Sequence, residues 1–271
     1  MSAVSAGEVV ATFVKRRKGS AVVPAAQLDC APGSGIVDDA NADAGSPRQV
    51  LLVAGEVERR LGLAPGALWE NITTSGIDVD TLSSGTQLRI GETAVLGLTY
   101  PCRPCTVITA ATGVAARRLT GQRGVLAVVV SGGTVSAGDP VRVLDAHFEP
   151  LPESYLDRCR LVVAQVPAGA VVTYDEVVTA IGAPAAVHRL LPAWLSRLGA
   201  QGLAAHRVIA SPQGPLGAEQ SRRLVAEGVA VGDQGVFTHG HGHRLGPTLT
   251  PWPTDRCCTW SSPAGAAPAS T

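Results

Sequence analysis

Two cysteines, Cys102 and Cys105, form a Cys-x-x-Cys pair in the middle of the chain. A thiolate is a soft nucleophile and a soft metal ligand, so such a pair can hold a soft metal or carry sulfur. No second pair supplies the other two ligands of a zinc site, which makes structural zinc the less favoured interpretation. Cys102 could be a second redox thiol, a resolving cysteine or a spectator, and two inert thiols are a further alternative.

Three histidines alternate with glycines in the run 238–244, at His239, His241 and His243. Closely spaced histidines can bind a transition metal. Because glycine lies between them, this backbone is flexible and would hold a metal weakly. We predict at most an adventitious metal site here.

The elements expected around the cysteine pair are short strands with small helices. Strands are predicted at 7–14, 48–53, 88–90, 94–98, 124–130 and 140–144, and helices at 56–63 and 115–119. Glycine-rich turns separate the strands, and 31–47 is predicted as a loop. This pattern favours a β-barrel with small helices over a βαβ repeat.

The pattern becomes helical after a proline-containing linker, 147–153. Tyr174–Ile181 is predicted as one helix, ended by Gly182, and 185–198 as a second with helical spacing of its apolar residues. Two helices joined by a Gly-Ala-Pro turn are typical of a helix-turn-helix. The tail 247–271, rich in Pro, Ser, Thr and Ala, is predicted to be disordered.

The composition is that of a folded protein without excess charge. Of 271 residues, 45% are hydrophobic and 16% charged, and the formal net charge is zero. This excludes a disordered chain and argues against a protein that coats nucleic acid electrostatically, although one helix could still enter a groove. No signal peptide or apolar run of membrane-spanning length is visible, so we expect a cytoplasmic protein with no membrane partner.

Several short motifs occur in a fixed order over about residues 7–145. They are Gly35–Asp39, Ser46–Leu52, Glu70–Asp78, Leu88–Gly91 and Pro104-Cys105, followed by Gly132-Gly133 and Gly138-Asp139. This series resembles the MOSC family, named from the C-terminal domain of molybdenum cofactor sulfurases. One departure is Asn41, which stands where many members have a histidine.

The resemblance implies a molybdenum cofactor, molybdopterin, with Cys105 as the catalytic residue and the metal or sulfur ligand. A pterin pyrophosphate needs cationic and hydrogen-bonding groups. The residues implied for cofactor binding are Arg48, Asn71, Thr73, Thr74 and Cys102. The activity implied is molybdenum-dependent reduction of small N-hydroxylated compounds, including bases, or the carriage of sulfur. Pyridoxal phosphate binding is also associated with the family as a whole.

A second series consists of Val166–Val178, the turn Gly182-Ala183-Pro184 and the run Ala204–Ile209. It resembles the DNA-binding domain of O6-alkylguanine-DNA alkyltransferases, a mostly α, winged-helix or helix-turn-helix domain. In the family's Pro-Cys-His-Arg-Val motif, Ala205 stands at the place of the acceptor cysteine. Alkyl transfer needs a thiolate, so alkyltransferase activity is not expected. The pattern is that of alkyltransferase-like proteins, which bind damaged DNA without repairing it.

This second resemblance implies a set of DNA-binding residues. Tyr174 matches the tyrosine that rotates the target phosphate. The family's intercalating arginine aligns with His188, so either His188 or the adjacent Arg189 inserts, or base flipping has been lost. The full predicted set is Tyr174, Ala185, Ala186, His188, Arg189, Ala205, His206, Arg207 and Ser211. The implied partners are double-stranded DNA with alkylated guanine and nucleotide excision repair proteins.

We therefore predict a MOSC domain at 1–146, the linker 147–153, an alkyltransferase-like domain at 154–246 and the tail. Three functions stay open: an enzyme or sulfur carrier, a non-enzymatic sensor of DNA alkylation with a degenerate MOSC module, and a regulatory DNA-binding protein that senses cofactor or sulfur. Bound molybdopterin with reductase activity would favour the first. Selective binding to alkylguanine duplexes would favour the second, and operator binding the third.

Overall fold

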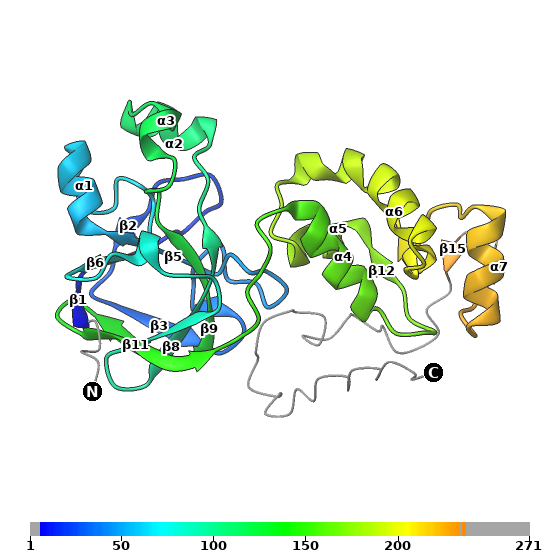
Figure 1. Ribbon diagram of the computed structural model, residues 1–271, viewed down its shortest axis with the longest axis horizontal. Helices are drawn as coiled ribbons and strands as arrows, with labels where there is room; N and C mark the ends of the chain where they lie inside the picture. Colours follow the sequence, from blue (N-terminus) through cyan, green and yellow to red (C-terminus); the bar gives the residue numbers. More distant parts are fainter. Residues whose placement is uncertain (1–5, 233–234, 237–271) are drawn as a thin grey trace, which may run out of the picture.

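The computed structural model describes residues 6–232 and 235–236. Figure 1 shows a mainly β half and a mainly helical half, which the chain joins once. The histidine run 238–244 and the tail 247–271 lie outside the described residues.

Seven strands of the N-terminal half close into a barrel. In order around the barrel they are β1 (Ala6–Val14), β6 (Ile72–Ser75), β5 (Val50–Ala54), β9 (Val125–Ser131), β8 (Ala94–Pro101), β7 (Thr86–Ile90) and β11 (Pro140–His147). The ring closes because β11 pairs with β1, for example at Gly7 and Val141. Only β5 and β6 pair in parallel among these neighbours. The expectation of a mainly β barrel with small helices is confirmed.

Shorter elements cover the barrel. A small antiparallel sheet contains β3 (Gln27–Ala31), β4 (Gly35–Ile36) and β10 (Gly133–Ser136), and β2 (Val23–Pro24) pairs with the end of β1. The helices are α1 (Gly55–Leu61), α2 (Thr106–Thr112), α3 (Ala116–Leu119) and the 3-10 helix η1 (Val79–Thr81). Helices α1, α2 and α3 lie towards one end of the barrel (Figure 1).

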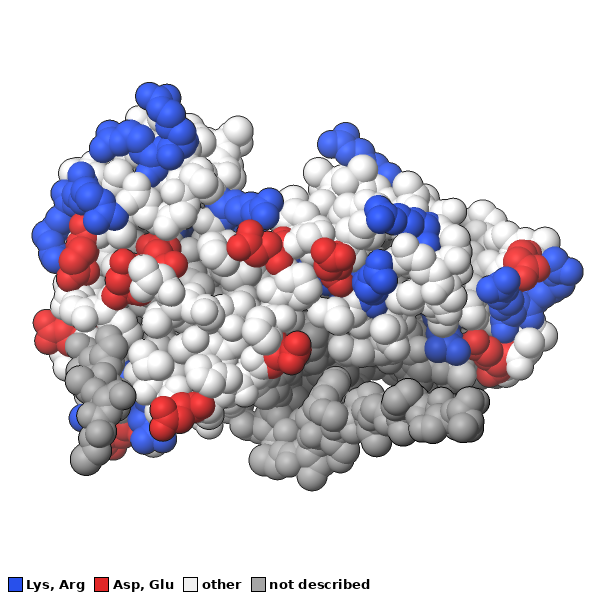
Figure 2. Space-filling view, viewed as in Figure 1, with Lys and Arg blue, Asp and Glu red and all other residues white. Residues whose placement is uncertain are grey.

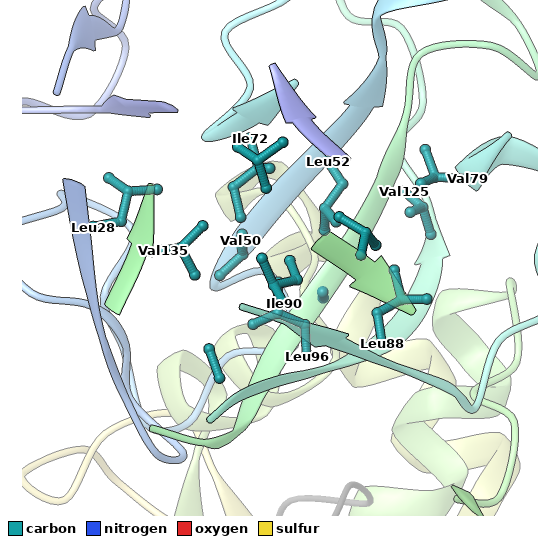
Figure 3. Close-up of a cluster of buried hydrophobic side chains, with 14 of the residues drawn as sticks. Leu28, Val50, Leu52, Ile72, Val79, Leu88, Ile90, Leu96, Val125 and Val135 are labelled. Atoms are coloured by element: carbon teal, nitrogen blue, oxygen red, sulfur yellow. The ribbon is translucent and has the colours of Figure 1, made fainter. Parts of the chain in front are cut away.

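Branched aliphatic side chains fill the barrel, as the scarcity of aromatic residues requires. Side chains alternate along a strand, so Leu88 and Ile90 of β7 point inward while Arg89 between them is exposed. Figure 3 shows Leu52, Leu88, Ile90 and Leu96 in this interior. Strand β5 is buried on both faces, because its other side packs in a second cluster that includes residues of α2 and α3.

The C-terminal half has a hydrophobic core of its own, formed by α4, α5, α6 and neighbouring residues. Its elements are α4 (Tyr155–Gln165), β12 (Val172–Thr173), α5 (Tyr174–Ala180), the 3-10 helix η2 (Ala185–Leu190), α6 (Leu191–Ala200), η3 (Ala205–Arg207), β13 (Val208–Ile209), α7 (Ala218–Ala226), β14 (Val231–Gly232) and β15 (Gly235–Val236). None of the described helices is long and apolar enough to span a bilayer.

One predicted helix is in fact two. The run 185–198 was expected to be continuous, but a 3-10 helix ends at Leu190 and α6 begins at Leu191. Pro192 explains the break, because a proline inside an α-helix removes one backbone hydrogen bond and clashes with the preceding turn. Pro192 lies in the first turn of α6, where the backbone N–H has no partner within the helix and no preceding turn is present to clash with the ring.

Candidate functional site

The two cysteines of the Cys-x-x-Cys pair lie in different environments. They follow β8, where the backbone N–H of Cys102 donates to the Gly124 carbonyl at 2.8 Å and fixes the segment against the start of β9. Cys102 is buried, whereas Cys105 is exposed directly before α2. Burial raises the pKa of Cys30 to about 12 and that of Cys159 to about 11. Cys105 is therefore the accessible thiol among the described cysteines.

Three cations converge near Cys102. Lys15 follows β1, Arg48 precedes β5 and Arg123 precedes β9. Burial lowers the pKa of Lys15, and the nearby Asp39 carboxylate opposes this effect by raising it. Arg123 and Arg48 lower the pKa of Lys15 further and Cys102 raises it, so all three lie close to the Lys15 ammonium. The Arg123 side chain is 6% exposed, and its Nε and Nη1 have no hydrogen-bond partner among the described residues. A buried guanidinium with free donors is costly, so this cluster favours an anionic ligand.

Asp39 connects this cluster to the polar residues of the Glu-Asn-Ile-Thr-Thr motif. Its carboxylate accepts from the backbone N–H of Lys15 at 2.7 Å and from the Asn71 side-chain amide at 2.8 Å. The Asn71 Oδ1 accepts from the N–H of Leu51 at 3.0 Å. The Nζ of Lys15 lies 5.0 Å from the centroid of the Trp69 ring, within range of a cation–π contact.

The predicted cofactor-binding residues Asn71, Thr73 and Thr74 are all buried and hydrogen-bonded within the protein. The Thr73 hydroxyl donates to Glu70 at 2.9 Å and the Thr74 hydroxyl is 3.4 Å from the Val53 carbonyl. Contact with a cofactor would require each to give up its present partner. In the structure they fix β6 and the strands beside the cation cluster.

Two buried carboxyl groups, Glu58 of α1 and Glu70, lie on either side of Thr73. The Thr73 hydroxyl is 3.4 Å from Glu58 Oε2, and Glu70 Oε1 also accepts from the backbone N–H of Gly66. Burial and the neighbouring Glu70 raise the pKa of Glu58 to about 9. Glu58 therefore carries a proton in the folded protein at neutral pH. Nothing in the sequence indicated this pair, because its residues lie on separate elements.

In the C-terminal half, the structure places Tyr174 and His188 together. Thr173 and Glu176 form a capping box that starts α5 at Tyr174. The Tyr174 and His188 rings are 6.4 Å apart in an edge-on arrangement, and His188 Nε2 lies 3.0 Å from Asp175 Oδ1. Other members of the predicted set, Ala185, Ala186 and Arg189, are exposed on η2.

The remaining members of this set lie around η3. Glu227, after α7, accepts from Arg207 Nε and Nη2 at 2.9 Å each and lies 2.8 Å from His206 Nε2. The hydrogen bonds from Arg207, with a further contribution from His206, lower the pKa of Glu227 to about 2. Ala205 is half-buried against the core. Ser211 lies two residues after β13, and Tyr174 directly follows β12. Because β12 and β13 pair in parallel, both residues lie at the same edge of this two-stranded sheet.

Replacing Glu227 with glutamine should destabilise the C-terminal half by about 1–2 kcal/mol at pH 7, because two charge-assisted hydrogen bonds weaken at a partly solvated site. Because the pKa of Glu227 is lower in the folded protein than in the unfolded chain, its ionised carboxylate stabilises the fold at pH values above 4.5. This stabilisation is lost as the pH falls from 4.5 towards 2. Denaturant unfolding at pH 7 and pH 3 measures both effects. The exposed Glu219→Gln is the control; equal losses in both variants would contradict the assignment.

Residues 44–142 match the family model of the MOSC domain. The chain therefore contains a MOSC domain. A search of curated proteins finds no match. Among solved structures, the chain is similar to the YuaD protein from Bacillus subtilis, with 20% identity, 54% of this chain and 98% of the other covered, and a TM-score of 0.44.

Two further solved structures have lower TM-scores. YiiM from Geobacillus stearothermophilus shares 14% identity over 82% of this chain and 98% of the other, with a TM-score of 0.42. S. pombe Atl1, solved in complex with damaged DNA containing O6-carboxymethylguanine, shares 26% identity over 29% of this chain and 79% of the other, with a TM-score of 0.26. All these TM-scores lie below 0.5, so no property of these proteins is transferred from them.

The MOSC domain meets the C-terminal half at the turn after α5. Arg48 Nη1 and the Tyr100 hydroxyl each lie 3.4 Å from the Gly182 carbonyl, to which both can donate. Gly182 has a φ of +63°, and an added Cβ would lie 2.8 Å from Pro47 Cγ and would also overlap the Tyr100 hydroxyl. Glycine is required here both for the backbone conformation and for the close approach.

Arg158 of α4 lies at the centre of this contact. It is 2% exposed and donates through Nε to the Ile181 carbonyl and through Nη1 to the Pro152 carbonyl, each at 2.7 Å. Its guanidinium carbon is 3.9 Å from the centroid of the Tyr100 ring and 4.8 Å from that of Tyr155. Arg158 thus connects α4 and the end of α5 to the MOSC domain.

A small, solvent-open pocket with a cavity volume of about 20 Å³ lies beside this contact. Its lining residues are Arg48, Tyr100, Pro101, Arg103, Glu153, Tyr155 and Arg158. Figure 2 shows a notch between the two halves, and basic side chains gathered over α1 and α3 of the MOSC domain. Sequence reasoning identified Arg48 but missed Lys15, Arg123 and Arg158. The one available signal was that Lys15 and Lys18 are the only lysines.

Proposed function

We propose that the MOSC domain binds an anionic cofactor of the molybdopterin type. The observation that carries the proposal is the buried Arg123 guanidinium with two free donors beside Cys102, Lys15 and Arg48. Arg48 and Arg123 form no ion pair with a carboxylate in the described part of the chain, so their charge is available to phosphate oxygens. These residues fit a phosphorylated ligand.

In this proposal the chain's own residues hold the ligand. Lys15, Arg48 and Arg123 bind its anionic groups, and Asp39 fixes the backbone of Lys15. Cys105 is the exposed thiol and supplies a soft sulfur ligand. No group of three or more His, Cys, Asp or Glu side chains that could hold a metal is found in the described residues. When bound, the cofactor would supply two-electron redox chemistry, consistent with reduction of N-hydroxylated compounds.

The test is molybdenum and pterin content of protein purified from a host that makes the cofactor. We expect stoichiometric loading in the wild type, loss of molybdenum in Cys105→Ala and loss of both molybdenum and pterin in Arg123→Gln. Cys30→Ala is the matched control, because the Cys30 thiol is buried with a pKa of about 12. Absence of pterin from the wild type, or equal loading of Cys105→Ala and wild type, would overturn the proposal.

A second candidate function is non-catalytic binding of alkylated guanine in DNA by an alkyltransferase-like domain at 154–246, with the MOSC domain within 1–146. The observation that favours it is the grouping of Tyr174 and His188 next to the exposed alanines of η2. Ala205 leaves this domain without the nucleophile for alkyl transfer.

Fluorescence anisotropy with a duplex carrying one O6-methylguanine, beside the unmodified duplex, tests the second candidate. Tyr174→Ala should weaken binding to the modified duplex by at least tenfold. Comparison of His188→Ala with Arg189→Ala shows which side chain inserts, since only the inserted one supports selectivity for the modified base. Equal affinity for both duplexes would contradict this function.

A further inference from the structure

The pocket between the MOSC domain and α4 has an excess of positive charge. Arg48 and Arg103 come from the MOSC domain and Arg158 from α4, while Glu153 is the single acidic residue of the lining. Arg103 and Glu153 lie 3.5 Å apart, but their side chains are 67% and 68% exposed, so solvent screens this pair. The pocket therefore favours an anion.

Arg158 adds a buried charge to this preference. Its partners are the Ile181, Pro152 and Glu153 carbonyls and two tyrosine rings, and no carboxylate pairs with it in the described residues. Burial lowers its pKa, which shows that its charged form is poorly solvated where it lies. A buried cation without a counter-ion is costly, so an anion beside it would be stabilising.

Two further hydrogen-bond donors of this pocket make only long hydrogen bonds. Arg48 Nη1 and the Tyr100 hydroxyl share one acceptor, the Gly182 carbonyl, and both distances are a long 3.4 Å. Either group could turn to a stronger acceptor without leaving a buried donor unsatisfied. Phosphate oxygens are such acceptors, and one planar guanidinium can donate two parallel hydrogen bonds to two oxygens of the same phosphate.

We propose that this pocket is a phosphate site built jointly by the MOSC domain and α4, so that the MOSC domain alone forms only part of it. The phosphate would come from either of two sources, a small phosphate monoester or the phosphate group of the cofactor under "Proposed function". Arg103 is its accessible cation, and Glu153 weakens its affinity by repulsion. The second source rests on the proposed function, whereas the first does not.

Isothermal titration of the full-length protein with inorganic phosphate and with methyl phosphate, at low salt and without cofactor, tests the site. We expect one phosphate per chain, about tenfold weaker binding in Arg103→Gln and two- to fivefold tighter binding in Glu153→Gln. Arg117→Gln, on the exposed side of α3, is the matched control and should bind as the wild type does. No binding by the wild type, or equal effects of Arg103→Gln and Arg117→Gln, would overturn the proposal.

Repeating the titration with cofactor-loaded protein separates the two sources. Loss of phosphate binding on loading means that the cofactor's own phosphate occupies the pocket, and unchanged binding means that a separate phosphate monoester does. Cys105→Ala should leave phosphate binding in the cofactor-free protein unchanged. If no cofactor is ever found but the Arg103 and Glu153 effects hold, the proposed function fails while the phosphate site stands.

Discussion

Replacing Arg158 with alanine is expected to destabilise the C-terminal half by about 2–5 kcal/mol and to loosen its contact with the MOSC domain. The substitution removes the two 2.7 Å bonds to the Ile181 and Pro152 carbonyls. It also empties the space between Tyr100 and Tyr155, where the guanidinium packs. Buried carbonyls without donors and a new cavity both favour unfolding.

Scanning calorimetry combined with limited proteolysis of the segment 147–153 measures both effects. We expect a lower transition temperature and faster cleavage in Arg158→Ala. Arg158→Lys should recover only part of the loss, because lysine cannot reproduce the planar guanidinium between two rings. Arg160→Ala, on an exposed position of the same helix, is the control. A change in Arg158→Ala no larger than in Arg160→Ala would show that Arg158 does not hold the halves together.

Replacing Glu58 with glutamine is expected to stabilise the protein at high pH. The pKa of Glu58 is about 9 in the folded protein, because of burial and the nearby Glu70, against an ordinary value of 4.5. Between these two values the folded state keeps a proton that the unfolded chain has lost, so stability falls as pH rises. Glutamine is isosteric with the protonated acid and does not titrate, so this loss disappears.

The difference in unfolding temperature between Glu58→Gln and the wild type should therefore be small near pH 4.5 and grow to about 5–10 °C near pH 9. Thermal unfolding at four or five pH values between these limits measures it. Glu56→Gln is the matched control, since this carboxylate lies on the same helix but is exposed. A pH-independent difference, or the same profile for Glu56→Gln, would contradict the shared burial of Glu58 and Glu70.

The sequence alone determined several strands of the barrel, because alternation along a strand is a local property. The strands predicted at 88–90 and 94–98 lie within β7 and β8, and the helix predicted at Tyr174–Ile181 matches α5 to within one residue. Strand β6 and helix α2 were missed. The first is a run of buried threonines inside a motif, and the second is a seven-residue helix in which Ile108 alone is buried, so neither shows the expected period.

Tertiary structure alone decided which residues meet. Lys15, Arg48 and Arg123 belong to separate strand ends, and they converge only because β11 closes the barrel on β1 and places β5 between β6 and β9. Arg158 reaches Tyr100 only because the C-terminal half packs on the barrel with Gly182 at the contact. Periodicity records the face on which a side chain lies. Barrel closure and the packing of the two halves bring together residues that are far apart in the sequence. No local sequence pattern encodes which of these distant residues come into contact.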